Sequence, residues 1–269
     1  MKKGIFFLMM MTVLFSSCGE YNKILKSTDY ELKYSYAKKY FNAKQYSRSA
    51  TILEELVTIF KGTPHAEESL YLLAQSYYGQ KDYQTASQYF NQYYTSYPKG
   101  EYVELARFYS GYGLYLDSPD YRLDQSQTHE AINQLQLYME YYPQSERAVE
   151  AQNILFELQE KLVYKELMAT RLYYNLGTYL GNNYLSAIIT AQNALKNYPY
   201  TKYREEFMYL MLQSKYNLAL VSVNEKLQGR YRDVVDEYFN YMNEFPEGKY
   251  VKQAQRYYNY SNKRISDGY

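Results

Sequence analysis

Three kinds of residue in this 269-residue chain could support chemistry: two histidines, one cysteine and three pairs of adjacent glutamates. His65 and His129 lack the HExxH spacing of zinc peptidases and have no cysteine beside them, so we interpret both as surface side chains. The paired carboxylates fall in predicted helices, where adjacent side chains point about 100° apart and cannot converge on one substrate. We therefore assign them to solvated helix faces. The pairs are Glu54–Glu55, Glu67–Glu68 and Glu205–Glu206.

The sequence also lacks the motifs of the common enzyme classes. It contains no glycine-rich phosphate loop and no GxSxG nucleophile motif. A single cysteine excludes an intramolecular disulfide framework and a cysteine-based zinc site. The 30 basic and 29 acidic side chains are balanced, whereas nucleic-acid binding normally requires a basic excess. We expect no catalytic residue, no metal, no bound cofactor and no nucleic-acid partner.

The one cysteine, Cys18, lies where a secretory signal would be cleaved. Lys2 and Lys3 precede an apolar run, Ile5–Phe15, which suits a signal peptide but is shorter than the about 20 residues that span a bilayer. The segment LFSSC resembles a bacterial lipobox, in which the cysteine thiol is acylated, although its leucine lies one position earlier than usual. We predict a lipoprotein signal peptide over 1–17 and a lipid, such as palmitate, on Cys18. An ordinary signal peptide and a chance cytosolic N-terminus are the alternatives.

The segment that follows the predicted cleavage point is short and mixed in polarity. We expect residues 18–27 to form a lipidated tether between the membrane and the folded part. No other segment carries 18 uninterrupted apolar residues, so nothing else is predicted to cross a membrane.

Two segments of the chain are close copies of each other, which indicates an internal repeat. YPKGEYVELARFY begins at Tyr97 and FPEGKYVKQAQRYY begins at Phe245, and related aromatic-proline marks occur at Pro143 and Pro199. Proline ends one helix and pre-organises the start of the next. Twelve residues before each proline lies a compact side chain, as expected where two helices cross. These residues are Ala86, Ala131, Ala187 and Val234.

This pattern resembles the tetratricopeptide repeat, a helical hairpin of about 34 residues. The best copy runs from Glu67 to Gly100, and a first copy covers about 30–63. The third and fifth copies need about seven and about nine extra residues, the fourth is about two residues short, and 145–168 is a further helical stretch. We predict an all-α fold, an α-solenoid of about five tetratricopeptide-like hairpins, rather than a generic helical bundle. Repeats one to three lie in 28–143, and the linking helix with repeats four and five lies in 144–269.

Aromatic residues recur on the predicted inner face of the first helices. Two of these helices carry a pair of rings seven residues apart, which is nearly two helical turns, so each pair lies along one face. Such a face suits a peptide, because rings give contact area at low entropy cost and hydroxyls give hydrogen bonds. The alternative is that the tether or a neighbouring helix covers the rings. The candidate peptide-binding groove consists of Tyr34, Phe41, Tyr71, Tyr78 and Tyr109.

The combination of a lipobox, a single solenoid, about five repeats and a long third-repeat insertion resembles the BamD family of outer-membrane lipoproteins. That resemblance implies a non-enzymatic subunit of the β-barrel assembly machinery, lipid-anchored at the outer membrane and facing the periplasm. It also implies that the C-terminal repeats bind the periplasmic domains of BamA. The N-terminal repeats would then face unfolded barrel precursors.

Two other functions are compatible with the same features. The first is another periplasmic repeat-bearing lipoprotein scaffold, for example in envelope or peptidoglycan assembly. The second is a surface nutrient-binding lipoprotein, although such chains are typically about twice as long and carry a separate ligand-binding region.

Overall fold

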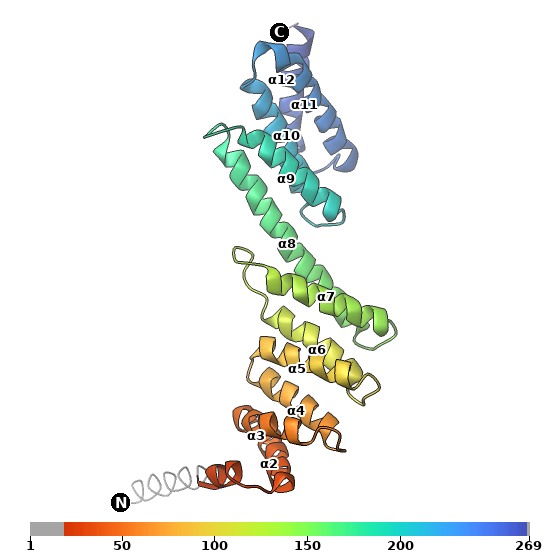
Figure 1. Ribbon diagram of the computed structural model, residues 1–269. Helices are drawn as coiled ribbons and strands as arrows, with labels where there is room; N and C mark the ends of the chain where they lie inside the picture. Colours follow the sequence, from red (N-terminus) through yellow and green to blue (C-terminus); the bar gives the residue numbers. More distant parts are fainter. Residues whose placement is uncertain (1–18, 268–269) are drawn as a thin grey trace, which may run out of the picture. The chain divides into compact units, whose positions relative to one another are not determined.

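The computed structural model describes residues 19–267, and within that range every regular element is a helix (Figure 1). The predicted all-α class is therefore confirmed. The helices are α2 (Tyr30–Asn42), α3 (Tyr46–Ile59), α4 (Ala66–Gly79), α5 (Tyr83–Ser96), α6 (Val103–Leu116), α7 (Ser126–Tyr141), α8 (Ala148–Leu176), α9 (Asn183–Asn197), α10 (Arg204–Leu220), α11 (Asn224–Glu244) and α12 (Val251–Ser266).

The helices form successive hairpins, in which each element packs on the next one in the chain. This holds from α2 to α7 and again from α9 to α12. Compact residues at the predicted crossing points, such as Ala86 and Ala131, have no exposed surface. Small side chains allow helices to approach closely, and each hairpin buries its apolar face on its neighbours. The predicted α-solenoid of tetratricopeptide-like hairpins is confirmed.

Two compact units divide the chain. The N-terminal unit extends to residue 155 but omits 120–123, which belong with 156–269 in the C-terminal unit. We predicted a division at 143/144, whereas the boundary falls inside α8. The expected linking helix and the first helix of the fourth hairpin are one continuous element of 29 residues. No proline or glycine interrupts that sequence, so nothing in it stops the helix.

The expected tether is ordered where the structure describes it. Residues 19–25 are helical, and Ile24 is only 4% exposed because it joins the core of the first hairpin. The Tyr21 ring meets Tyr40 edge-on at a centroid distance of 5.6 Å. The Tyr36 hydroxyl also donates to Glu20 at 2.8 Å. Residues 19–25 are therefore a helix packed on α2 and α3, so this part of the expected tether belongs to the folded unit.

The extra residues of the third and fifth repeats are accommodated in different ways. In the third repeat they form the connection between α6 and α7, whereas in the fifth they lengthen α10 and α11 to 17 and 21 residues. Among residues 19–267, no helix combines the length and apolar character needed to cross a bilayer.

Candidate functional site

The aromatic face predicted for the N-terminal unit is a ladder of tyrosines from the first helices of hairpins two and three. Tyr71 and Tyr78 lie on α4, Tyr102 is the N-cap residue of α6, and Tyr109 lies within α6. Tyr71 stacks on Tyr102, with ring centroids 4.3 Å and planes 11° apart. Tyr78 meets Tyr109 edge-on at 5.2 Å. Contacts of this kind contribute about 0.5–1.5 kcal/mol each beyond the area that they bury. We call these four residues the N-terminal ladder.

The ladder combines a buried ring with partly accessible ones. Tyr71 is buried, while Tyr78, Tyr102 and Tyr109 are half-buried. Burial raises the pKa of Tyr71 to about 12 and also raises the pKa of Tyr78. Both hydroxyls are therefore protonated at neutral pH. The face presents ring surface and neutral hydroxyls, which can contact an apolar or uncharged polar segment.

Two of the predicted groove residues lie apart from this ladder. Tyr34 is buried, its ring centroid lies 4.7 Å from that of His65, and its hydroxyl donates to Glu68. Phe41 contacts Tyr46 edge-on at 5.6 Å. Of the five predicted residues, the structure brings Tyr78 and Tyr109 into direct contact and joins Tyr71 to them through the ring of Phe90. A role in peptide binding for any of the five stays a prediction.

The C-terminal unit contains a second ladder that the sequence reasoning missed. Tyr209 stacks on Tyr250 with centroids 4.1 Å and planes 6° apart, and Tyr216 stacks on Tyr257 at 4.4 Å. A usable signal was present, because Tyr209 and Tyr216 are also seven residues apart. Tyr250 and Tyr257 also match Tyr102 and Tyr109 in the copied segments. We call Tyr209, Tyr216, Tyr250 and Tyr257 the C-terminal ladder.

The hydroxyl of Tyr93, in the last turn of α5, holds the backbone at Tyr102, whose ring belongs to the N-terminal ladder. The Tyr93 hydroxyl donates to Oε1 of Glu67 at 2.5 Å and accepts the backbone N–H of Tyr102 at 3.0 Å. Glu67 lies in the first turn of α4, where the helix dipole favours a negative charge. One tyrosine at the end of α5 therefore ties the start of α4 to the start of α6. We call the Tyr93–Glu67 pair a Tyr–Glu bridge.

The same bridge recurs in the fifth hairpin. The Tyr241 hydroxyl donates to Glu205 at 2.8 Å and accepts the backbone N–H of Tyr250 at 3.1 Å. In the third hairpin Tyr138 donates to Ser145 at 2.7 Å, and Ser145 donates to Glu104 at 2.5 Å.

The glycine of the copied segments is explained by this bridge. A Cβ atom added at Gly100 would lie 2.5 Å from Oε1 of Glu67 and 2.6 Å from the Tyr93 hydroxyl. At Gly248 it would lie 2.6 Å from the Tyr241 hydroxyl. Real Cβ atoms essentially never approach other atoms so closely, so the direct Tyr–Glu bridge requires a glycine at this position. The third hairpin has Ser145 there instead, and its hydroxyl lies between Tyr138 and Glu104.

The fourth hairpin shows the complementary arrangement. Ala194 takes the place that tyrosine holds in the second, third and fifth hairpins, five residues before the proline, and Thr201 takes the place of Gly100 and Gly248. The Thr201 hydroxyl donates to Glu160 at 3.1 Å and accepts the backbone N–H of Tyr203 at 3.2 Å. A short side chain thus supplies the same two hydrogen bonds from the opposite side.

The assignment to a solvated face is confirmed for Glu54 and Glu55, which are exposed, and is corrected for the other two pairs, which are half-buried. All six carboxylates have protein partners, and none of the pairs opens onto a shared substrate position. Glu54 accepts from Tyr77, Glu55 from Lys33, Glu67 from Tyr93, Glu68 from Tyr34, Glu205 from Tyr241 and Glu206 from Arg171.

Two other predicted features concern metals and the lipid. Among residues 19–267, no group of three or more His, Cys, Asp or Glu side chains could hold a metal ion. Cys18, the predicted lipid attachment site, lies outside the described residues.

Comparison with known proteins gives a family match and several structural likenesses. The family model described as outer membrane lipoprotein, YfiO, matches residues 27–229. The chain is similar to a crystal structure of nearly identical TPR-like repeats from Podosopora anserina, at 13% identity and a TM-score of 0.33, over 78% of this chain and 95% of that one. No curated protein matches it. Because the family match spans most of the sequence and all five hairpins begin within it, this chain belongs to the YfiO family of outer membrane lipoproteins.

Proposed function

We propose that the protein is a BamD-like, non-enzymatic lipoprotein scaffold of the outer-membrane β-barrel assembly machinery. The observation that carries this proposal is the match to a family of outer membrane lipoproteins across the repeats that hold the N-terminal ladder. In this proposal a lipid on Cys18 anchors the chain at the outer membrane, and the repeats face the periplasm. The first hairpin then lies close to the membrane, because residues 19–25, which follow Cys18 in the sequence, are packed on it.

The two ladders suit two protein partners. Unfolded barrel precursors expose aromatic and apolar side chains, and rings with neutral hydroxyls can bind such segments without an ion pair. We assign the N-terminal ladder to precursors and the C-terminal repeats to a BamA-like barrel subunit. Partner binding rather than catalysis fits a chain whose paired carboxylates are all held in hydrogen bonds or ion pairs.

Affinity purification from detergent-solubilised membranes tests the proposal. We expect a BamA-like barrel subunit to co-purify with the full-length protein. Deletion of residues 224–267, which removes α11 and α12, should abolish that co-purification while the N-terminal unit keeps its helical circular dichroism. Recovery of peptidoglycan-assembly proteins without a barrel subunit would indicate the alternative periplasmic scaffold. Retention of a glycan would indicate the nutrient-binding lipoprotein.

A further inference from the structure

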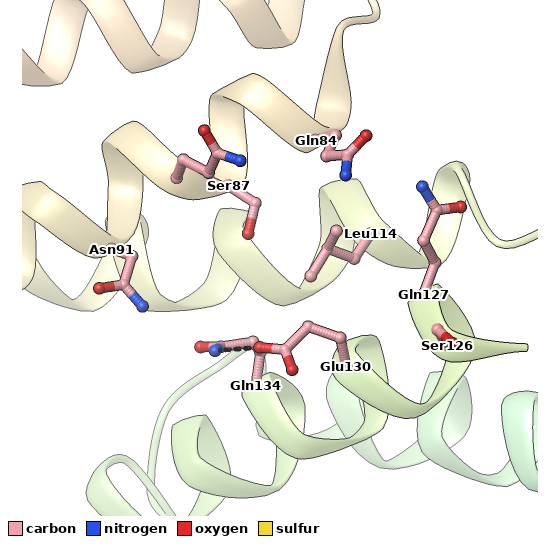
Figure 2. A pocket seen from close by; sticks show the side chains of 9 residues that line it. Gln84, Ser87, Asn91, Leu114, Ser126, Gln127, Glu130 and Gln134 are labelled. Carbon is pink, nitrogen blue, oxygen red and sulfur yellow. Dashed lines mark hydrogen bonds between the residues drawn. The ribbon is translucent and has the colours of Figure 1, made fainter.

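A second groove of the N-terminal unit lies on its other helices. It opens between α5 and α7, has a volume of about 530 Å³ and has Leu114 of α6 at its floor. Figure 2 shows amide side chains from α5 and α7 facing each other across it. The ladder uses α4 and α6, so the groove belongs to a different surface. The amide and carboxylate side chains that line this groove are Gln84, Gln88, Asn91, Gln127, Glu130 and Gln134.

The two walls of the groove differ in how their amides are held. On α7, the Gln134 amide nitrogen donates to Glu130 at 2.8 Å while its oxygen accepts from Tyr94 at 3.0 Å. On α5, Gln84 and Gln88 are exposed and have no hydrogen-bond partner among residues 19–267. On the same wall, the Asn91 side chain accepts from the Thr95 hydroxyl at 3.5 Å. The α7 wall is therefore held by internal hydrogen bonds, whereas Gln84 and Gln88 of the α5 wall are free to bond to a ligand.

The ligand that matches an amide row is a peptide backbone. A glutamine or asparagine offers a donor and an acceptor, as does each non-proline residue of a main chain. Positions 84, 88 and 91 are about 6 and 4.5 Å apart along α5, whereas groups on one side of an extended chain repeat about every 6.6 Å. Flexible side chains can take up that difference. The row of amides therefore spans about three residues of extended polypeptide.

The C-terminal unit has an equivalent groove in which apolar side chains replace two of the glutamines. It lies between α9 and α11, has a volume of about 300 Å³ and is lined by Leu185 and Ile189. Counted from the prolines at 98 and 199, these two residues occupy the positions of Gln84 and Gln88. Gln192 lines this groove at the position of Asn91, so the two grooves differ at the positions of Gln84 and Gln88. The hairpin architecture thus provides the groove in both units, whereas glutamine amides at these two positions belong to the N-terminal one.

We propose that the α5–α7 groove binds an extended, uncharged polypeptide segment through its backbone. Glu130 is the one charged side chain in the lining, so the site has no cation to recruit an acidic ligand. The amides instead satisfy backbone N–H and C=O groups of any sequence that stays extended. The proposal needs neither ladder, and it would hold for a scaffold with other partners.

Backbone recognition can be tested with a pair of fluorescent peptides. The first alternates threonine and valine, and the second has the same sequence with alternate backbone nitrogens methylated. N-methylation removes donors but keeps the side chains. We expect the first peptide to bind the full-length protein in fluorescence anisotropy, and N-methylation to weaken binding by at least about tenfold, as the loss of one or two hydrogen bonds does.

A matched protein variant completes the test. Gln84→Leu with Gln88→Ile introduces the side chains of the C-terminal groove at two exposed positions, and it should weaken binding by at least about tenfold without changing the unfolding midpoint. Tyr200→Ala, at a position that is 90% exposed and lies outside both the groove and the N-terminal ladder, should leave peptide affinity unchanged. Equal affinity for both peptides, or unchanged affinity in the double variant, would overturn the proposal. Self-association of the parent protein that the double variant abolishes would also overturn it, because the groove would then hold a second copy.

Discussion

The hydroxyl of Tyr93 lies 2.5 Å from Oε1 of Glu67, and this bond joins the last turn of one helix to the first turn of its partner. The same hydroxyl accepts the N–H of Tyr102, whose ring stacks on Tyr71 in the N-terminal ladder. A structural hydrogen bond and the candidate binding face are therefore directly connected. The C-terminal unit repeats the connection through Tyr241, Glu205 and Tyr250.

Removal of the bridging hydroxyl should destabilise the hairpin. Tyr93→Phe keeps the buried ring but leaves the N–H of Tyr102 without its partner and removes a donor from Glu67. We expect a loss of about 1–3 kcal/mol in the free energy of unfolding, measured with urea. Tyr200→Phe is the control, because Tyr200 is 90% exposed and should show no change. Equal stability of the Tyr93→Phe variant and the parent would contradict the bridge.

The tyrosine and the glycine of the copied segments should be energetically coupled. Gly248→Thr alone places side-chain atoms against the Tyr241 hydroxyl and should destabilise the C-terminal unit. Combined with Tyr241→Ala, it reproduces the Ala194 and Thr201 arrangement of the fourth hairpin. In a double-mutant cycle we expect a favourable coupling of about 0.5–3 kcal/mol. Simple additivity of the two changes would show that the fourth-hairpin arrangement cannot be transferred.

Alkaline pH should unfold the protein at lower denaturant concentration. The folded-state pKa of Tyr71 is about 12, above its ordinary value of 10, so the unfolded chain loses this proton first. This contribution to stability is complete below pH 10 and is lost as the pH rises from 10 to 12, by roughly 3 kcal/mol for Tyr71. Urea unfolding at several pH values measures the decline. Tyr71→Phe should make it shallower, whereas Tyr200→Phe should not.

A photo-crosslinker at the N-terminal ladder should capture unfolded barrel precursors. Position 78 is the best choice, since its ring is half-buried, whereas Tyr71 is buried and its replacement would disturb the core. A crosslinker at position 200, which is far more exposed, is the control and should capture much less. Absence of precursor at position 78, while the C-terminal repeats still retain a BamA-like subunit, would refute the assignment of the ladder.

Membrane attachment should depend on the predicted lipid. Cys18→Ala removes the thiol that would be acylated, so the variant should appear in the soluble fraction after cell lysis. The parent protein should require detergent. A Cys18→Ala variant that still requires detergent would contradict lipid anchoring, and mass spectrometry of the mature N-terminus would locate the true cleavage point.

The sequence by itself determined the helical hairpins and most of their boundaries. Proline and glycine spacing marks where helices end, and buried alanines twelve residues upstream mark where helices cross, because both constraints act locally. The ring pair at Tyr71 and Tyr78 was visible for the same reason, since helical periodicity alone places them on one face. The second ladder could also have been found from the copied segments.

Only the tertiary structure decided which contacts these residues make with other helices. Glu67 and Tyr93 are 26 residues apart, and nothing local shows that a carboxylate in one helix meets a hydroxyl from the next. The same is true of Gly100, which reads as a turn residue but is needed because the bridge occupies the space of its Cβ. The burial of Tyr34 and the packing of Ile24 likewise depend on neighbouring helices. Periodicity places a side chain on a face, and long-range packing decides what covers that face.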